Sequence, residues 1–202
     1  MATTAAFTLP KGAAPKIKAL FDYWQSIHPA ARPGGSGDEA SLPGRQHLDP
    51  IDIPELLPNI WMIDVTHEAP VYDAAGANAP GTNAPGTNAL ADNVLGGIGP
   101  SRDTLRFRFR LVGTEIVKFT GRDATGCWLD EIYPDYLNTE AFRAHCAVAE
   151  SGQPGYRKSG VLSNPGRNFV EAERLYLPLA EDGRHVDIVL VMTVYKGDPP
   201  RR

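Results

Sequence analysis

Cysteine is the least frequent residue of this 202-residue sequence, which contains only Cys127 and Cys146. The two thiols form no C-x-x-C pair, and two cysteines are too few for a disulfide framework or for a structural zinc site built on thiolates. Secreted small domains are typically rich in cysteine, whereas cytosolic proteins keep few and reduced thiols. We therefore expect a protein of the reducing cytoplasm.

Long hydrophobic runs are also missing. No window reaches the roughly 18 consecutive apolar residues that a membrane-spanning helix needs. Residues 1–20, MATTAAFTLPKGAAPKIKAL, lack the charged region followed by an apolar region that marks a signal peptide. The sequence predicts neither export nor a membrane span.

The chain has no surplus of positive charge. The sequence contains 20 lysines and arginines and 24 aspartates and glutamates, which gives a formal net charge of −4 and a pI near 5.7. Proteins that hold nucleic acids through the phosphate backbone need a basic surface. Nucleic acid is therefore not a predicted partner.

Catalytic and phosphate-binding motifs are absent as well. Gly113, Gly121 and Gly126 follow a strand-like run, but they are too widely spaced for a P-loop or a G-x-G-x-x-G turn. We expect each glycine to end an element or to let backbone pass closely. There is no G-x-S-x-G or H-E-x-x-H motif, and the five histidines are scattered. We predict no enzyme, no cofactor and no metal site.

An amphipathic helix is predicted at residues 15–27, where one apolar stripe contains Ile17, Leu20, Phe21, Trp24 and Ile27. This stripe packs either on the body of its own subunit or on a second subunit. After a loop over residues 29–45, Asp52 is a candidate cap for a short helix, IPELL, that Pro58 ends.

Five strands are predicted, at Ile60–Val65, Leu105–Leu111, Tyr156–Leu162, Phe169–Leu179 and Val186–Tyr195. Apolar residues alternate with Arg106, Arg108 and Arg110 in the second strand, so its arginines face water or a partner. Asp182-Gly183 favours a hairpin between the last two strands. The final strand is apolar on both faces, which indicates a central position. Glu171 and Glu173 lie on one strand face, and we expect Glu173 to pair with Arg174.

Short helices are predicted between the second and third strands. Thr114 is a candidate cap for one turn that Gly121 ends, and CWLDEIYPDY forms a second short segment. The clearest helix begins after Asn138 or Thr139 and ends at Gly152. The resulting class is α+β, a five-stranded antiparallel sheet with helices between strands two and three and an N-terminal helix.

Residues 66–103 have no periodicity and contain the repeat NAPGTNAPGTNA, with Asn78, Asn83 and Asn88 five residues apart. A five-residue unit of this composition cannot bury a core, so we expect a mobile surface insertion. The predicted organisation is an N-terminal helix and irregular extension at 1–58, a domain at 59–196, and a tail at 197–202.

Three sequence blocks in this order resemble a family of single-domain PAS-like proteins common in alphaproteobacteria. They are LDPIDIPELLPNIWMIDV, FRFRLVGTEIVKFTGRDATGCWLDEI and ERLYLPLAEDGRHVDIVL. The second carries the R-x-R-L-V-G-T, G-R-D-x-T-G and L-D-E motifs of the family. Two features depart from it, namely the 66–103 insertion and Cys127 in place of a basic or polar residue.

The resemblance implies the PAS fold, in which ligands lie between the inner face of the sheet and the middle helices. The residues that it places there are Phe109, Arg110, Leu111, Trp128, Phe142 and Tyr176. Large aromatics can fill such a space or wall a cavity, and we expect a filled core. An open one, with a few polar groups among apolar walls, would suit a small organic ligand.

The resemblance does not bring a known chromophore. His145 lies on the longest middle helix, where some PAS proteins carry a haem ligand, but a structural histidine is the expected role. Cys127 lies in GCWLDE, which lacks the N-C-R-F-L-Q pattern of the flavin-binding light sensors. Neither haem nor flavin is predicted.

The predicted function is a cytoplasmic PAS-like sensory or regulatory module, homodimeric, that acts through contact with a separate signalling protein, with or without a small ligand that biases its conformation. The alternative is a sensor that holds a small organic ligand or cofactor in the PAS pocket. An enzyme, the third hypothesis, has no catalytic constellation to support it.

Overall fold

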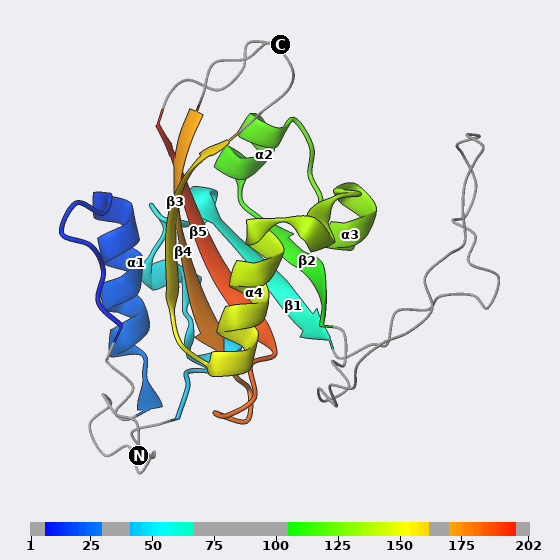
Figure 1. Cartoon of the computed structure of the whole chain (residues 1–202). Coiled ribbons are helices and arrows are strands. Elements are labelled where there is room, and N and C mark those ends of the chain that lie inside the picture. The colour runs from blue at the N-terminus through cyan, green and yellow to red at the C-terminus, as the bar shows by residue number, and fades with distance from the viewer. Residues whose placement is uncertain (1–6, 30–40, 67–104, 162–169, 197–202) are drawn as a thin grey trace, which may run out of the picture.

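A five-stranded antiparallel sheet runs through the part of the chain that the structure describes (Figure 1). The structure is a computed structural model and describes residues 7–29, 41–66, 105–161 and 170–196. The strands are β1 (Ile60–Thr66), β2 (Arg106–Val112), β3 (Gly155–Val161), β4 (Val170–Leu179) and β5 (Ile188–Lys196). They follow the order β2-β1-β5-β4-β3, and all neighbours are antiparallel. The predicted α+β class is confirmed.

Several predictions fall wholly or partly on residues outside the described ranges. These are residues 30–40 of the 29–45 loop, the 66–103 insertion with its repeat, apart from Thr66, the strand ends Leu162 and Phe169, and the 197–202 tail.

The helices lie on both faces of the sheet. Helix α1 (Pro15–Ser26) covers one face, and Figure 1 shows the helices from the β2–β3 segment on the other. Those helices are α2 (Thr114–Thr120), α3 (Leu129–Ile132) and α4 (Glu140–Ser151), with a 3-10 turn, η5 (Tyr136–Asn138), between α3 and α4. Three further 3-10 turns, η2 (Arg45–His47), η3 (Pro50–Asp52) and η4 (Leu57–Asn59), lead into β1.

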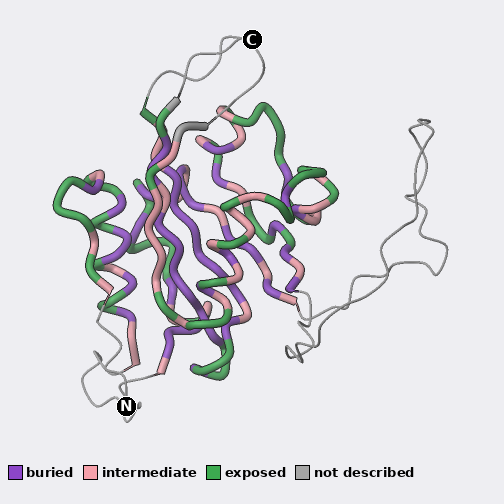
Figure 2. The backbone as a smooth tube through the Cα atoms, viewed as in Figure 1, coloured by how far each residue is buried: buried purple, intermediate pink, exposed green. Residues whose placement is uncertain are grey.

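Strand β5 occupies the centre of the sheet, as its sequence predicted. Leu190, Val191 and Met192 are completely buried, although their side chains alternate between the two faces. A strand that is apolar on both faces needs cover on both. The buried residues in Figure 2 accordingly concentrate in the central strands.

Helix α1 packs on the sheet of its own chain. Its Ile17 and Leu20 are fully buried, and the Trp24 indole Nε1 donates a hydrogen bond to the Pro178 carbonyl of β4 at 3.1 Å. Of the two sequence-based alternatives for this helix, packing within the subunit is the one observed.

A buried carboxylate ties the start of α1 to the sheet. Glu173 of β4 is 1% exposed, and its Oε2 accepts hydrogen bonds from the Ala14 backbone N–H at 2.8 Å and the Tyr156 hydroxyl at 3.1 Å. Lys196 Nζ lies 2.9 Å from Oε1. Burial by itself raises the pKa of Glu173, but these donors outweigh it and the net pKa is lowered. The predicted partner, Arg174, lies on the opposite face because neighbouring strand residues alternate.

The middle helices begin and end largely where their capping residues indicate. The Thr139 hydroxyl accepts the Phe142 N–H at 3.2 Å to cap α4, and Gly152 ends the helix in the left-handed conformation, with φ +63°. Gly121 ends α2 in the same way. Thr114, expected as the cap of α2, is instead its first residue, and Gly113 holds the cap position.

The predicted IPELL helix is wrong. The chain forms two 3-10 turns, η3 and η4, separated at Ile53–Leu56, and the Asp49 side chain caps the first by accepting the Ile51 N–H. Pro50, Pro54 and Pro58 interrupt any longer ladder because each lacks a backbone donor.

Gly113 lies where the backbone of the β2–α2 junction passes very close to the backbone of η4 and β1. Its N–H donates to the Ile60 carbonyl at 2.8 Å. A Cβ at this position would lie 2.5 Å from the Ile60 and Pro58 carbonyl oxygens and 2.6 Å from that of Leu57. The glycine therefore allows the β2–α2 junction to sit on η4, and no anion site is needed to explain it.

Across the described ranges, no helix combines the length and the apolar character required to cross a bilayer.

Replacing Gly113 with alanine is expected to destabilise the fold by about 1–3 kcal/mol, because the new methyl overlaps carbonyl oxygens of η4 and β1. Urea denaturation measures the change. Gly12→Ala is the matched control, since a Cβ there meets no heavy atom within 4 Å, and its effect should stay within about 0.5 kcal/mol. Equal losses in the two variants would contradict the close approach at Gly113.

Glu173→Gln should cost about 2 kcal/mol near neutral pH, because the amide cannot replace the charged acceptor for Lys196 and the Ala14 N–H. The pKa of Glu173 is lowered in the folded state. Its contribution is therefore complete above the ordinary glutamate pKa and is lost as the pH falls through the lowered value. Unfolding at a series of pH values should show wild type and variant converging in acid. Glu171→Gln, an exposed position on the same strand, is the control and should change little.

Candidate functional site

A cavity of about 630 Å³ lies between the sheet and helices α2, α3 and α4. Its volume is in the range of sites that hold small organic ligands, roughly 300–1,000 Å³. The expectation of a filled core is therefore wrong for this region. The aromatic side chains wall an open space rather than occupying it.

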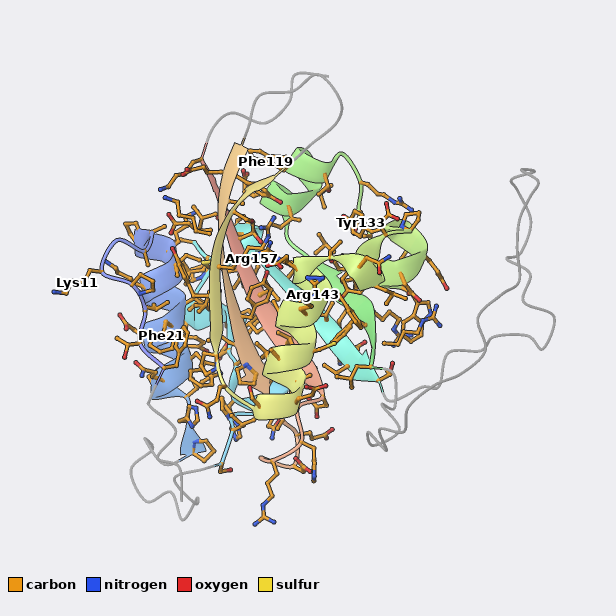
Figure 3. The ribbon with its side chains drawn as sticks, in the orientation of Figure 1. Lys11, Phe21, Phe119, Tyr133, Arg143 and Arg157 are labelled. Atoms are coloured by element: carbon orange, nitrogen blue, oxygen red, sulfur yellow. The ribbon has the colours of Figure 1, made fainter. Side chains whose placement is uncertain are left out.

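Both layers contribute to the cavity wall. Every strand supplies at least one residue, and together these are Trp61, Phe109, Arg157, Ser159, Arg174, Tyr176, Thr193 and Tyr195. The helical side supplies Ile116, Phe119, Thr120, Arg122, Ala124, Leu129, Ile132, Tyr133, Tyr136, Thr139, Glu140, Ala141 and His145. Figure 3 shows Phe119, Tyr133 and Arg157 on the side of the sheet that α2, α3 and α4 cover, and Phe21 of α1 on the opposite side.

Of the six residues predicted to line the pocket, Phe109 and Tyr176 do so, and the other four lie elsewhere. A β-bulge explains two of the corrections. Met62 pairs with Leu111 and Ile63 pairs with Phe109, so Arg110 is an extra residue in β2 and the alternation of its faces is broken. As a result Leu111 is 41% exposed, and Arg110 forms an ion pair with Asp64 at 2.9 Å.

Trp128 and Phe142 lie beside the cavity rather than on its wall. The Arg106 guanidinium stacks 4.1 Å from the centre of the Trp128 ring, at the edge strand β2. Phe142 is partly buried and packs against Phe107 and Tyr136, with ring centres 6.0 and 5.3 Å away. Phe142 thus supports Tyr136 of the wall from behind, whereas Trp128 packs on arginines of β2 that lie outside the wall.

His145 is buried in the wall and is 1% exposed. Its Nδ1 lies 2.6 Å from the Tyr136 hydroxyl, while its Nε2 has no hydrogen-bond partner among the described residues. Burial lowers the pKa of His145 to about 3, and the charges of Arg174 and Arg157 act in the same direction. The imidazole is therefore neutral at physiological pH.

Tyr176 supplies a second unpartnered polar atom. It is 1% exposed, and within the described ranges its hydroxyl completes no hydrogen bond, although the Arg157 guanidinium lies close enough to oppose the rise in the Tyr176 pKa that burial causes. Its ring centre lies 5.3 Å from that of His145. Buried polar atoms almost always have a partner, so each exception calls for an explanation. The two exceptions, His145 Nε2 and Tyr176 Oη, lie on the wall of one cavity.

A row of polar side chains crosses the sheet along the cavity floor. In the strand register, Arg157 of β3 lies opposite Arg174 of β4, which lies opposite Thr193 of β5. The Trp61 indole extends the row from β1 by donating to the Thr193 hydroxyl at 3.0 Å. Arg174 Nη1 donates to the Ser159 hydroxyl at 2.9 Å. Hydrogen bonds to Thr193 and Ser159 thus hold the Trp61 and Arg174 side chains in position.

Sequence reasoning did not place Arg157, Arg174 or Ser159 in the site. Arg174 is two residues from Tyr176, which was predicted to line the pocket, so alternation along β4 could have identified it. Arg157 and Ser159 required the register between β3 and β4, which no local pattern specifies. His145 was expected to have a structural role, and a haem ligand was the alternative.

The arrangement suits binding. It combines aromatic walls with a few fixed hydrogen-bond donors and one neutral imidazole. In the described part of the chain, histidine, cysteine and carboxylate side chains form no group of three or more that could hold a metal ion.

Because the pKa of His145 is low in the folded state, the unfolded chain binds one more proton below about pH 6.5. Its contribution to stability should fall by about 1.4 kcal/mol per pH unit as the pH decreases from 6 toward 4. Urea midpoints at three pH values measure this slope. His145→Phe, which removes the titrating ring and keeps its size, should flatten the slope; an unchanged slope would show that His145 is not the group responsible.

Comparison with known proteins gives no relative from which to transfer a function. A scan against protein-family models, a search of curated proteins and a search of solved structures each returned no match.

Proposed function

We propose that this chain is a cytoplasmic PAS-like regulatory module that binds a small organic molecule in the cavity between its sheet and helices α2–α4. Binding biases the conformation of those helices, and the protein passes the signal by contact with a separate protein. The observation that carries the proposal is the open cavity with two unpartnered polar atoms, His145 Nε2 and Tyr176 Oη, on its wall.

The position of the cavity supports the PAS-like assignment. The resemblance implies a ligand site between the inner sheet face and the helices that follow the second strand, and the cavity lies there. The three resembling sequence blocks contribute Trp61 of β1, Phe109 of β2 and Tyr176 of β4 to its wall.

An occupant accounts for the cavity better than a role in protein contact alone. Apolar walls around open space lose contacts that a filled core would make, which lowers stability. Large side chains line the cavity, yet two of them stack on each other instead of filling it. Phe119 stacks on Tyr195 with ring centres 3.8 Å apart.

A ligand in this cavity would touch both the rigid sheet and the short helices. Tyr133 follows α3 and is 45% exposed, and Phe119 lies near the end of α2. Both residues line the cavity. Contacts made to them only when ligand is bound give the differential interaction energy that a conformational switch requires. We therefore expect the partner protein to contact the surface around α2 and α3.

The predicted homodimer stays a prediction. The apolar stripe of α1, one candidate for a dimer interface, is already buried against β4 and β5 of the same chain. A dimer would have to use another surface, and light scattering of the purified protein measures whether one forms.

Filling the cavity tests the proposed function. Ala141 of α4 lines the cavity, whereas Ala147 of the same helix does not line it and is exposed. We expect a thermal-shift and NMR screen of neutral and charged organic fragments to find ligands of the wild type. Ala141→Phe should weaken them about tenfold or more, and Ala147→Phe should leave them unchanged.

Two further measurements complete the test. Native mass spectrometry and absorbance above 350 nm of the freshly purified protein would detect a co-purified ligand, haem or flavin. If no fragment binds and nothing co-purifies, the cavity is not a ligand site, and the module acts through protein contact alone.

A further inference from the structure

Two arginines face each other across neighbouring strands on the cavity floor. Arg157 and Arg174 are directly paired in the β3–β4 register, and both line the cavity. Like charges directly opposite each other destabilise a sheet. Such a pair is stable when a counter-charge lies between or beside the two guanidinium groups.

The protein supplies little of that counter-charge. Glu140 approaches Arg157 with an N–O distance of 3.7 Å, but it is 67% exposed, so this is a weak surface pair. Arg174 pairs with no carboxylate of the described residues, and its hydrogen bond there is the one to Ser159. A third cavity arginine, Arg122, likewise has no ion pair within those ranges. Three arginines and one glutamate leave the wall positively charged.

The charge of Arg174 acts on the interior of the cavity. Burial raises the pKa of Tyr133, Tyr176 and Tyr195. The Arg174 charge opposes that rise at each of these three hydroxyls. These tyrosines come from different elements around the cavity, so Arg174 is directed toward the space that they enclose.

We propose that the ligand of this cavity is a small aromatic carboxylate whose carboxylate group is held by Arg174 and Arg157. This inference rests on the proposed function of the cavity as a ligand site. A guanidinium offers five N–H donors in a planar fork that matches a carboxylate, and Arg174 uses one of its donors on Ser159. The Thr193 hydroxyl lies next in the same row.

The rest of the wall selects the body of the molecule. Trp61, Phe109, Phe119 and Tyr195 present aromatic rings, and Leu129 and Ile132 add aliphatic surface. Flat aromatic groups pack well against such walls. Arg174 is the floor arginine that pairs with no carboxylate of the described residues, so a single carboxylate is enough to supply the missing counter-charge there. A phosphate ester offers acceptors of the same kind, and the test below separates the two anions.

The test compares acids with their neutral amides. Benzoate, 2-naphthoate and indole-3-acetate are titrated calorimetrically against benzamide, 2-naphthamide and indole-3-acetamide, at fixed low salt. We expect at least one acid to bind about tenfold or more tightly than its amide, because the charged hydrogen bonds are lost in the amide. Phenyl phosphate and inorganic phosphate are included to distinguish a phosphate site.

Variants locate the effect. Arg174→Gln should weaken the acid about tenfold or more and change the amide less than threefold, whereas Arg174→Lys should restore part of the difference. Arg108→Gln is the matched control, since Arg108 lies on the edge strand β2, pairs with Asp64 and does not line the cavity. Circular dichroism and thermal unfolding verify that each variant is folded, and Arg157→Gln serves as a second test if Arg174→Gln is not.

The outcomes separate this inference from the proposed function. Equal binding of acid and amide, both lost in Ala141→Phe, overturns the carboxylate inference and keeps the ligand site. Preference for phenyl phosphate over every carboxylate overturns it in favour of a phosphate site. If the acids, the amides and the fragments of the thermal-shift and NMR screen all fail to bind, the proposed function fails as well.

Discussion

The structure depends on the need to cover both faces of β5. This central strand is apolar on each side, so the sheet is stable only between two layers, and the two layers come from different parts of the sequence. Helix α1, which precedes all the strands in the sequence, covers one face, and the helices between β2 and β3 cover the other. The cavity follows from how completely each layer covers its face of the sheet.

The two layers differ in how tightly they close. On the α1 side, Ile17 and Leu20 are fully buried, and Glu173 fixes the start of the helix through the Ala14 N–H. On the other side the cover is assembled from one two-turn helix, one single turn and α4, which cannot follow the twisted sheet along its whole length. The space left between this cover and the sheet is the cavity, which therefore lies on the face that α2, α3 and α4 cover.

The chemistry of the cavity comes from what its floor and wall leave unsatisfied. The floor brings two arginines into register and gives Arg174 a hydroxyl rather than a carboxylate as partner. The wall holds a neutral imidazole and a tyrosine hydroxyl that have no partner in the described residues. A packed core does not keep such groups without compensation. The proposed organic anion would supply the counter-charge that the floor lacks.

The sequence by itself determined the local elements, because their signals are local. Runs of β-type residues, alternating in β2 and apolar on both faces in β5, predicted the five strands. Apolar spacing predicted α1, and Thr139 and Gly152 marked the ends of α4. Tertiary structure decided the site. The bulge at Arg110 turned Leu111 outward, and the register between β3 and β4 placed Arg157 beside Arg174. Whether the aromatics filled the space or walled it depended on how the helices seat on the sheet. These outcomes depend on contacts between residues far apart in the chain, whose energies no local pattern of residues contains.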